Sequence, residues 1–271
     1  MKSPDLPQLE GRLEVAVGAA RQAGEQTLQL YRTEEIGIEH KSDGSPVTRA
    51  DREAETLLRE LICQQYPEDG ILGEEFPEKI GTSGYQWILD PIDGTKSFVA
   101  GVPLYTTLVA VMRDELPQIG VIFAPAAGEM VFAERGQGCW HVIGAGQPQR
   151  TQVSGVAELK DATFLTTSVK AYTTRRERDA RQVYDDLQAA CRLTRTWGDA
   201  FGYLLVATGR AEVMIDPVMN LWDAAALSPV IEEAGGRFFD WQGKSTVHSG
   251  ETIATNGALA QQVMEIVSAG A

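Results

Sequence analysis

The spacing of apolar residues changes near residue 85, and this change restricts the fold more than any other feature of the chain. Before it, Leu13, Val17, Ala20 and Gly24 recur at intervals of three or four residues, which predicts an amphipathic helix over residues 9–31. A second helix is expected to begin at a capping box and to end before residue 67. After residue 85, short apolar runs bounded by turns predict strands over residues 87–89, 104–112, 119–123 and 130–133.

The second half of the chain mixes both kinds of spacing. Strands are expected over residues 162–166, 211–215, 238–239 and 253–255, and helices over residues 175–190, 200–209, 222–233 and 259–267. The polar segment 144–156 is expected to connect an N-terminal half, residues 1–145, to a C-terminal half, residues 146–271, within one catalytic unit. Helices interleaved with antiparallel hairpins favour layered sheets covered by helices over a barrel or a purely doubly wound sheet.

One short run stands out after the strand at residues 87–89: Asp90-Pro91-Ile92-Asp93-Gly94-Thr95. Because Pro91 fixes φ and lacks an N–H group, we expect the strand to end there and the chain to turn. That turn would aim both carboxylates and the Ile92 carbonyl at one point, where a hard cation such as Mg²⁺ would bind. Gly94 would allow a close backbone approach, and a helix beginning at Thr95 would offer N–H groups to a phosphate.

Three other acidic positions have ordinary structural explanations when each is taken alone. Glu74 follows a probable strand end at residues 71–72 and would be a surface acid. Asp223 precedes an apolar helix and would be an N-cap. Asp51 completes the capping box that Thr48 begins. Within the run at residues 90–95, in contrast, two crowded carboxylates would repel one another without a cation, which favours a functional role for that run.

In their order and spacing, residues 73–75, 90–95 and 222–223 resemble the motifs of the inositol monophosphatase-like superfamily of Mg²⁺-dependent, lithium-sensitive phosphatases. The resemblance runs from about residue 10 to residue 258. It implies an α+β fold, the layered α-β-α-β-α sandwich of that superfamily, in a protein that is usually a homodimer. It also implies two or three Mg²⁺ ions in each active site.

The resemblance further implies roles for individual residues. The metal ligands would be Glu74, Asp90, the carbonyl of Ile92, Asp93 and Asp223. Phosphate would be bound by Asp93, Gly94 and Thr95. The catalytic residues would be Glu74, Thr95 and Asp51, with Asp51 paired to Thr95 so that the two help orient the attacking water.

The expected chemistry needs no histidine, cysteine or serine nucleophile. Two cations can lower the pKa of a bound water, clamp the phosphoryl oxygens and stabilise the leaving alkoxide. We therefore expect direct in-line attack by water on a small phosphate monoester, without a phosphoenzyme. The P-loop pattern GxxxxGK[ST] is absent from the sequence, which argues against an NTPase or a kinase.

Substrate recognition is expected from the second half, at Gly198, Asp199, Ala200 and Asp216. Carboxylates beyond a metal–phosphate centre suit an ester whose other end is cationic, as in histidinol phosphate. Residues 90–98, 198–203, 232–236 and 240–243 also resemble the histidinol-phosphatase branch of the superfamily. Two alternatives remain open: Asp199 could be only the N-cap of the next helix, and Asp216 could pair with Arg195.

Two alternatives to the histidinol-phosphatase hypothesis also remain. One is hydrolysis of inositol 1-phosphate or of a broad set of sugar phosphates. The other, from a different class, is a catalytically weak homologue that serves as a regulatory or binding protein. Such a homologue should have lost a carboxylate of the motifs, and none is missing here.

Composition restricts the partners and the compartment. A net charge of −14 disfavours nucleic acid as the main partner. The three cysteines are far apart, which favours reduced thiols and a cytoplasmic protein. No apolar run is long enough to be a signal peptide or a membrane span. The three histidines lie near no cysteine, so we do not expect a zinc site.

Overall fold

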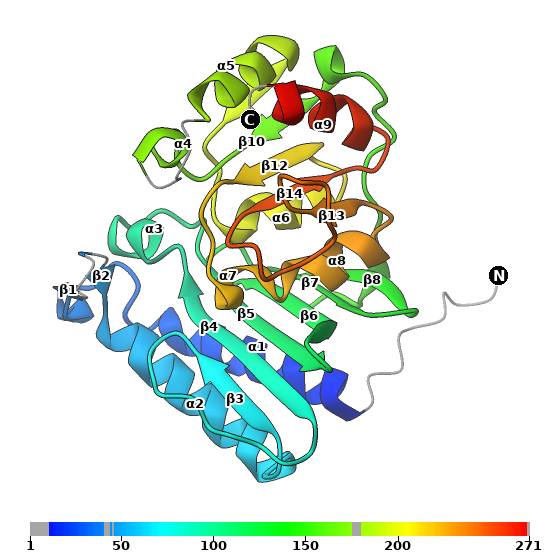
Figure 1. Ribbon diagram of the computed structural model, residues 1–271. Helices are drawn as coiled ribbons and strands as arrows, with labels where there is room; N and C mark the ends of the chain where they lie inside the picture. Colours follow the sequence, from blue (N-terminus) through cyan, green and yellow to red (C-terminus); the bar gives the residue numbers. More distant parts are fainter. Residues whose placement is uncertain (1–10, 41–43, 45, 175–179, 270–271) are drawn as a thin grey trace.

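The computed structural model describes residues 11–40, 44, 46–174 and 180–269. Within these residues two β-sheets alternate with three layers of helices, which gives the α-β-α-β-α order that the sequence predicts (Figure 1). The expected α+β sandwich is therefore confirmed.

The outer layer on one side consists of two long helices, α1 (Gly11–Thr27) and α2 (Arg49–Gln65). The predicted capping box begins α2: the Thr48 hydroxyl accepts the Ala50 N–H at 3.1 Å, and the Asp51 carboxylate accepts the Thr48 N–H at 2.7 Å. Both helices pack on the first sheet through apolar side chains such as Val17, Leu58 and Trp87. A 3₁₀ turn, η1 (Glu34–Ile36), and a two-stranded ribbon of β1 (Glu39–His40) and β2 (Pro46–Val47) lie between the two helices in the sequence.

The first sheet has seven strands in sequence order. They are β3 (Gly70–Gly73), β4 (Tyr85–Asp93), β5 (Thr106–Arg113), β6 (Leu116–Ala124), β7 (Glu129–Glu134), β8 (Gly138–Ile143) and β9 (Gln149–Arg150). Only the β3–β4 pair is parallel. The β5–β6 hairpin turns at Asp114 and Glu115, as predicted, and both residues have positive φ, which suits the twist of a tight hairpin.

The expectation that the strand ends at Pro91 is wrong. β4 continues to Asp93 and pairs with β5 through a β-bulge: Asp90 lies opposite Leu108 and Asp93 lies opposite Thr106. The bulge leaves an extra residue on β4, so the missing N–H group of Pro91 costs no ladder hydrogen bond. The Pro91 carbonyl is satisfied by the Thr107 hydroxyl at 2.9 Å. The bulge, and not a turn, therefore re-aims the two aspartates.

The second sheet has five strands in the order β11-β10-β12-β14-β13. They are β10 (Thr163–Leu165), β11 (Leu193–Arg195), β12 (Val213–Asp216), β13 (Arg237–Phe239) and β14 (Thr252–Thr255). β10 is parallel to β11 and β12, whereas β14 is antiparallel to β12 and β13. A 3₁₀ turn, η2 (Leu159–Asp161), precedes β10.

Helices fill the space between the sheets and cover the outer face of the second sheet. The middle layer contains α6 (Ala200–Ala207), α7 (Leu221–Ala224) and α8 (Leu227–Glu233), and a short helix, α3 (Thr95–Val99), follows β4. The outer layer contains α4 (Ala171–Thr174), α5 (Arg181–Ala190) and α9 (Ala260–Ala269). α6 is buried along its whole length, which explains its apolar and small residues.

Two helix predictions need correction. The helix expected over residues 222–233 is divided into α7 and α8, because Pro229 has no N–H to donate to the Ala225 carbonyl four residues earlier. The helix expected over residues 175–190 is described only as α5, since residues 175–179 lie outside the described residues. Five strands were not predicted: β1, β2, β8, β9 and β11.

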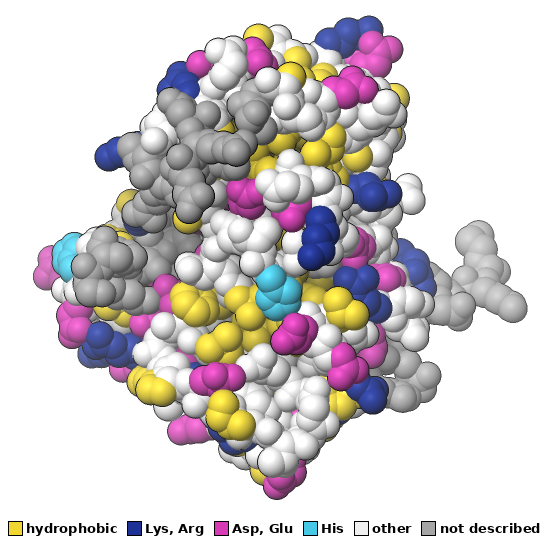
Figure 2. All heavy atoms as spheres, in the orientation of Figure 1, with side chains coloured by type: hydrophobic (Ala, Val, Ile, Leu, Met, Phe, Trp, Pro, Cys, Tyr) yellow, Lys and Arg dark blue, Asp and Glu magenta, His cyan; other side chains and the backbone are white. Residues whose placement is uncertain are grey.

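The surface carries acidic and basic side chains interspersed over the face that Figure 2 shows, with acidic groups in excess over the whole sequence. Among the described residues, no helix combines the length and hydropathy that a bilayer span requires. The division into residues 1–145 and 146–271 stays a prediction.

Candidate active site

A cleft of about 880 Å³ opens between the two sheets. Its lining is rich in acidic side chains: Glu74, Asp90, Asp93, Asp199, Asp216 and Asp223. The lysines that line it are Lys96 and Lys170, and both are exposed. Each sequence-predicted residue from 90 to 95 except Pro91 lines this cleft, as do Gly198 and Ala200. Residues far apart in the sequence therefore converge on one acidic cleft.

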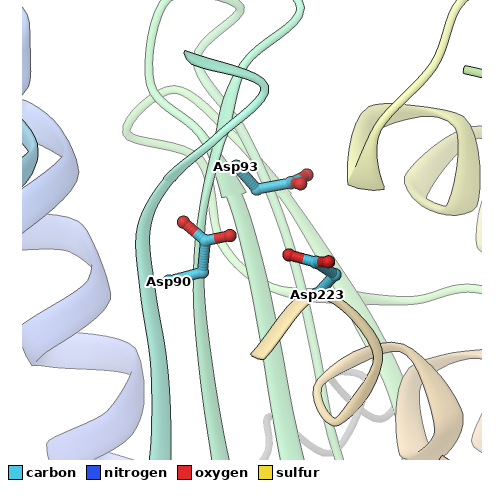
Figure 3. A group of neighbouring side chains, drawn as sticks. All are labelled: Asp90, Asp93 and Asp223. Atoms are coloured by element: carbon cyan, nitrogen blue, oxygen red, sulfur yellow. The ribbon is translucent and has the colours of Figure 1, made fainter. Parts of the chain in front are cut away.

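Strand alternation explains how three carboxylates meet. Asp90 lies two residues after Ile88, so its side chain leaves β4 on the face that the middle helices cover. The bulge brings Asp93 to the same region, and the first turn of α7 brings Asp223 from the second half. One carboxylate oxygen from each residue lies within 4.8 Å of the others. Figure 3 shows the three carboxylates turned toward a shared space between the strand and the helix.

Each of these aspartates is held by backbone hydrogen bonds. Asp90 Oδ1 accepts the Ile92 N–H at 3.1 Å. Asp93 Oδ2 accepts the Thr106 hydroxyl at 3.1 Å and the Ala200 N–H at 2.5 Å. Asp223 is the third residue of α7, and its Oδ2 accepts the N–H of the N-cap residue Asn220 at 2.7 Å. Asp223 thus lies in the first turn of α7, as expected, but the expectation that it would be the N-cap is wrong, because Asn220 occupies that position.

The electrostatics of the cluster are unfavourable without a cation. Burial raises the pKa of Asp90 well above its usual value, and the charges of Glu74, Asp93 and Asp223 raise it further. Burial likewise raises the pKa of Asp93 well above its usual value, and the bond from Ala200 N opposes this. Buried carboxylates this close cannot all be ionised unless a positive charge joins them.

The residues fit a hard divalent cation. Carboxylate oxygens are the ligands that Mg²⁺ prefers, and oxygens around one Mg²⁺ lie at most about 4.2 Å apart, so a small side-chain adjustment would suffice. Burial also raises the pKa of Asp223, against the hydrogen bonds from Asn220 that lower it. Asp90, Asp93 and Asp223 could therefore bind a metal ion.

Glu74 lies in the same cleft but outside this tight group of three. Its loop follows β3 and is fixed by the buried Glu55, which accepts the Glu75 N–H at 2.8 Å and the Arg59 side chain at 2.8 Å. A side chain at Gly73 would overlap the Glu55 carboxylate, with only 2.1 Å between the added Cβ and Oε1. Glu55 was not singled out by sequence analysis, because one glutamate on a helix carries no distinguishing pattern.

The predicted pairing partners Asp51 and Thr95 are adjacent. The Thr95 hydroxyl lies 3.4 Å from Asp51 Oδ1 and 3.1 Å from the Ile92 carbonyl, so its single proton can reach either acceptor. Burial raises the pKa of Asp51 to about 6, although two hydrogen bonds from Thr48 lower it. The same aspartate therefore caps α2 and faces the motif threonine.

Position 94 requires glycine. Its φ of 85° lies in the left-handed region, and a Cβ there would lie 2.8 Å from Asp199 Oδ2. The residue precedes α3, so the chain enters this helix beside the carboxylate of Asp199. Gly94 therefore lies where the first half of the cleft meets the second.

Asp199 has an unusual backbone. Its φ of 52° and ψ of −161° fall in a region that glycine alone adopts readily, at a typical cost of about 1–3 kcal/mol. Among the described residues, its side chain makes no cap hydrogen bond to α6. Burial raises the pKa of Asp199 to about 7, Asp216 raises it further, and Lys96 lowers it. Asp199 therefore occupies the N-cap position of α6, as the alternative expected, but its side chain does not act as a cap.

Asp216 is buried at the end of β12 and does not use Arg195 as its partner. Its Oδ1 accepts the Thr167 N–H at 3.0 Å, and its Oδ2 accepts the Tyr203 hydroxyl at 3.3 Å. Burial raises the pKa of Asp216 to about 6, against the effect of these hydrogen bonds. Arg195 instead donates to the Thr194 carbonyl.

Three polar residues of the site were missed in the sequence: Thr106, Thr167 and Tyr203. Thr106 and Tyr203 lie inside apolar runs, where a hydroxyl gives no distinct pattern. Thr167 follows the strand predicted at residues 162–166. Its polar side chain directly after a strand was the sequence signal that could have identified it as a site residue, because strand ends at a sheet edge commonly carry binding residues.

A layered sandwich with a buried carboxylate cluster in an inter-sheet cleft defines a class of protein that could hold a divalent cation beside a small ligand. The inositol monophosphatase family model matches residues 8–270, and the chain belongs to this family. The chain is 40% identical to a histidinol-phosphatase of Chlorobaculum parvum, over 95% of this chain and 97% of that relative.

Two further proteins support this assignment. A histidinol-phosphatase of Mycobacterium tuberculosis is 38% identical over 95% of this chain and 98% of its own length. A solved Thermotoga maritima IMPase is 28% identical, covers 95% of this chain and 97% of its own, and superposes with a TM-score of 0.83. The chain is thus an enzyme, a phosphoric monoester hydrolase.

Proposed function

We propose that the enzyme hydrolyses L-histidinol phosphate to L-histidinol and phosphate. The observation that carries this proposal is a second acidic group, Asp199, held against the cleft wall beside Gly94. A carboxylate in that place favours an ester whose non-phosphate end is cationic. Histidinol phosphate carries an amine and an imidazole, and relatives 38–40% identical are named histidinol-phosphatases.

Metal binding is assigned to Glu74, Asp90, the Ile92 carbonyl, Asp93 and Asp223. Two or three Mg²⁺ ions bound there would lower the pKa of a water molecule and neutralise the charge of the phosphate. The support is the convergence of Asp90, Asp93 and Asp223 and the raised pKa of Asp90 and Asp93.

The remaining roles belong to residues around this cluster. Asp51 holds the Thr95 hydroxyl, and together with Glu74 these residues orient the attacking water for in-line attack. The backbone around Gly94 and Thr95 binds the phosphate together with Asp93. Asp199 and Asp216, with the backbone of Gly198 and Ala200, bind the leaving group.

The test is a phosphate-release assay with Mg²⁺ across histidinol phosphate, inositol 1-phosphate and adenosine 3′,5′-bisphosphate. We expect the highest kcat/KM with histidinol phosphate. A kcat/KM for histidinol phosphate no greater than for the other two esters would contradict the proposal.

Inositol 1-phosphate, or a set of sugar phosphates, is the second candidate. The size of the cleft, about 880 Å³, leaves room for a ring with several hydroxyl groups. This candidate predicts comparable kcat/KM values for inositol 1-phosphate and other neutral esters, which the same assay measures.

We also propose a cytoplasmic homodimer that acts in histidine biosynthesis. Cys63, Cys139 and Cys191 are free thiols, which suits a reducing compartment. Light scattering at several protein concentrations tests the oligomeric state, and a mass of one chain at all of them would contradict the dimer. Complementation of a histidine auxotroph that lacks histidinol-phosphatase tests the pathway.

A further inference from the structure

Asp199 keeps its backbone conformation although that conformation is unfavourable for a residue with a side chain, so its surroundings must hold it there. The neighbouring helix restrains only the backbone of this residue: the Gly202 N–H donates to the Asp199 carbonyl at 3.0 Å, and the Asp199 side chain makes no cap hydrogen bond among the described residues. A further restraint comes from the segment that follows β10.

Thr167 provides that restraint through its hydroxyl group. Thr167 Oγ1 accepts the Asp199 N–H at 2.8 Å. The contact between the two segments is so close that a Cβ at Gly198 would lie 2.3 Å from the Thr167 Cα. Gly198 is thus needed because the Thr167 backbone passes directly against it, and Thr167 then fixes the next residue along the chain.

The same threonine also holds the second acidic residue. Its backbone N–H donates to Asp216 Oδ1 at 3.0 Å. Thr167 therefore accepts from the Asp199 N–H through its hydroxyl and donates to Asp216 through its own backbone N–H, so one residue connects the two aspartates.

The two carboxylates differ in how many of their oxygens accept a hydrogen bond. Asp216 Oδ1 and Oδ2 are both occupied, by Thr167 and Tyr203. Among the described residues, no donor is hydrogen-bonded to the Asp199 carboxylate, which lies beside Gly94 in the cleft. The group available to a cationic ligand is therefore Asp199, in the orientation that Thr167 imposes.

We propose that Thr167 is a positioning residue for substrate selection: its hydroxyl holds Asp199 in the cleft-facing conformation that discriminates cationic esters from neutral ones. This inference rests on the proposed function, in which Asp199 binds the cationic leaving group. Thr167 itself need not touch the substrate.

The test compares Thr167→Val with Thr167→Ser. Valine has nearly the same shape as threonine and keeps the backbone N–H to Asp216, but it lacks the hydroxyl. Serine keeps the hydroxyl. We measure KM and kcat of each variant for histidinol phosphate and for inositol 1-phosphate. Loss of this one hydrogen bond should lower the preference for the cationic ester by about tenfold in Thr167→Val, chiefly through KM, and Thr167→Ser should retain it.

A neighbouring threonine provides the matched control. Thr166 is fully buried, and its hydroxyl has no hydrogen-bond partner among the described residues. Thr166→Val makes the same chemical change one residue away, so it should leave the preference between the two esters as it is. An equal loss in both valine variants would overturn the inference.

A double-mutant cycle separates positioning from general damage. If Thr167 acts through Asp199, then Thr167→Val should cause no further loss of preference in an Asp199→Asn background. Independent, additive losses would overturn the inference.

The two proposals fail in different ways. A wild-type enzyme without preference for the cationic ester would overturn the proposed substrate, and this inference with it. A wild-type preference that persists in Thr167→Val would overturn only the role of Thr167.

Discussion

The two ends of the cleft are both built from aspartates, but their oxygen atoms are occupied differently. At the proposed metal end, Asp90, Asp93 and Asp223 turn oxygens toward one another within 4.8 Å. At the proposed substrate end, Asp216 is bonded on both oxygens, and Asp199 leaves its carboxylate open among the described residues. The first arrangement requires cations for stability, whereas the second presents one oriented negative charge.

The supporting structure differs as well. The metal end rests on a long strand in the middle of two buried layers, so a single bulge determines where Asp90 and Asp93 point. The substrate end rests on loops after β10 and β12 and before α6. The proposed roles would therefore place chemistry on the rigid element and recognition on the connections, where sequence can vary at lower cost.

The largest expected effect comes from Asp90→Asn. Loss of one charged oxygen at the metal end should lower kcat by about 10³-fold for every ester, since this charge stabilisation acts on the phosphate itself. Wild-type protein should also gain about 2.7 kcal/mol of unfolding free energy when Mg²⁺ exceeds its Kd a hundredfold, and the variant should gain much less. Phosphate release measures kcat, and urea unfolding with and without Mg²⁺ measures the gain in unfolding free energy.

Asp161→Asn is the matched control for this prediction, because Asp161 is exposed and remote from the cleft lining. Retained turnover in Asp90→Asn, or equal stabilisation of both variants by Mg²⁺, would contradict the metal assignment.

Asp199→Asn should affect only one class of substrate. Removal of the open charge should raise KM for histidinol phosphate by about 10- to 100-fold, the range expected for a hydrogen bond to a charged group. KM for inositol 1-phosphate should change much less. Steady-state kinetics with both esters check this, and equal changes for both would show that Asp199 does not read the charge of the leaving group.

Gly94→Ala should disturb the metal end and the substrate end of the cleft at the same time. A φ of 85° is unfavourable for alanine by about 1–2 kcal/mol, and the added methyl group would also press on Asp199. We expect reduced thermal stability and reduced kcat/KM for both esters. Gly128→Ala is the control, since Gly128 has a similar φ of 68° but open space around it. Loss of stability without any kinetic change would indicate that Gly94 does not join the two ends.

The smallest expected effect concerns pH and stability. Burial raises the pKa of Asp216 to about 6, so between roughly pH 4 and pH 6 the native state keeps a proton that the unfolded chain has lost. This group therefore makes the native protein less stable as pH rises through that window. The side chain at position 216 of the Asp216→Asn variant cannot titrate. As pH rises through this window, the unfolding free energy of the variant should therefore increase relative to that of the wild type, by at most about 1.4 kcal/mol per pH unit.

Urea unfolding of both proteins at several pH values measures this difference. A difference that does not change with pH would mean that Asp216 ionises in the native state as it does in the unfolded chain.

Apolar spacing, which is a local pattern, predicted layered sheets covered by helices, and the family resemblance that the short acidic motifs carry implied the convergence of distant carboxylates. The sequence did not predict the bulge at Pro91, since a proline after a buried strand normally ends pairing, and the unpaired position depends on β5. Nor did it predict Thr167 or Glu55, whose partners lie 32 and 20 residues away. Such contacts follow from tertiary packing and leave no periodicity in the chain.

The hydrogen bond from the Ala200 N–H to Asp93 Oδ2 joins the catalytic strand to the recognition loop through the main chain. Any residue but proline can supply this donor, and the natural residue is already alanine, so alanine scanning would pass over the connection entirely. Its contribution would emerge only when the peptide linkage itself is altered, for example when semisynthesis replaces the amide before residue 200 with an ester.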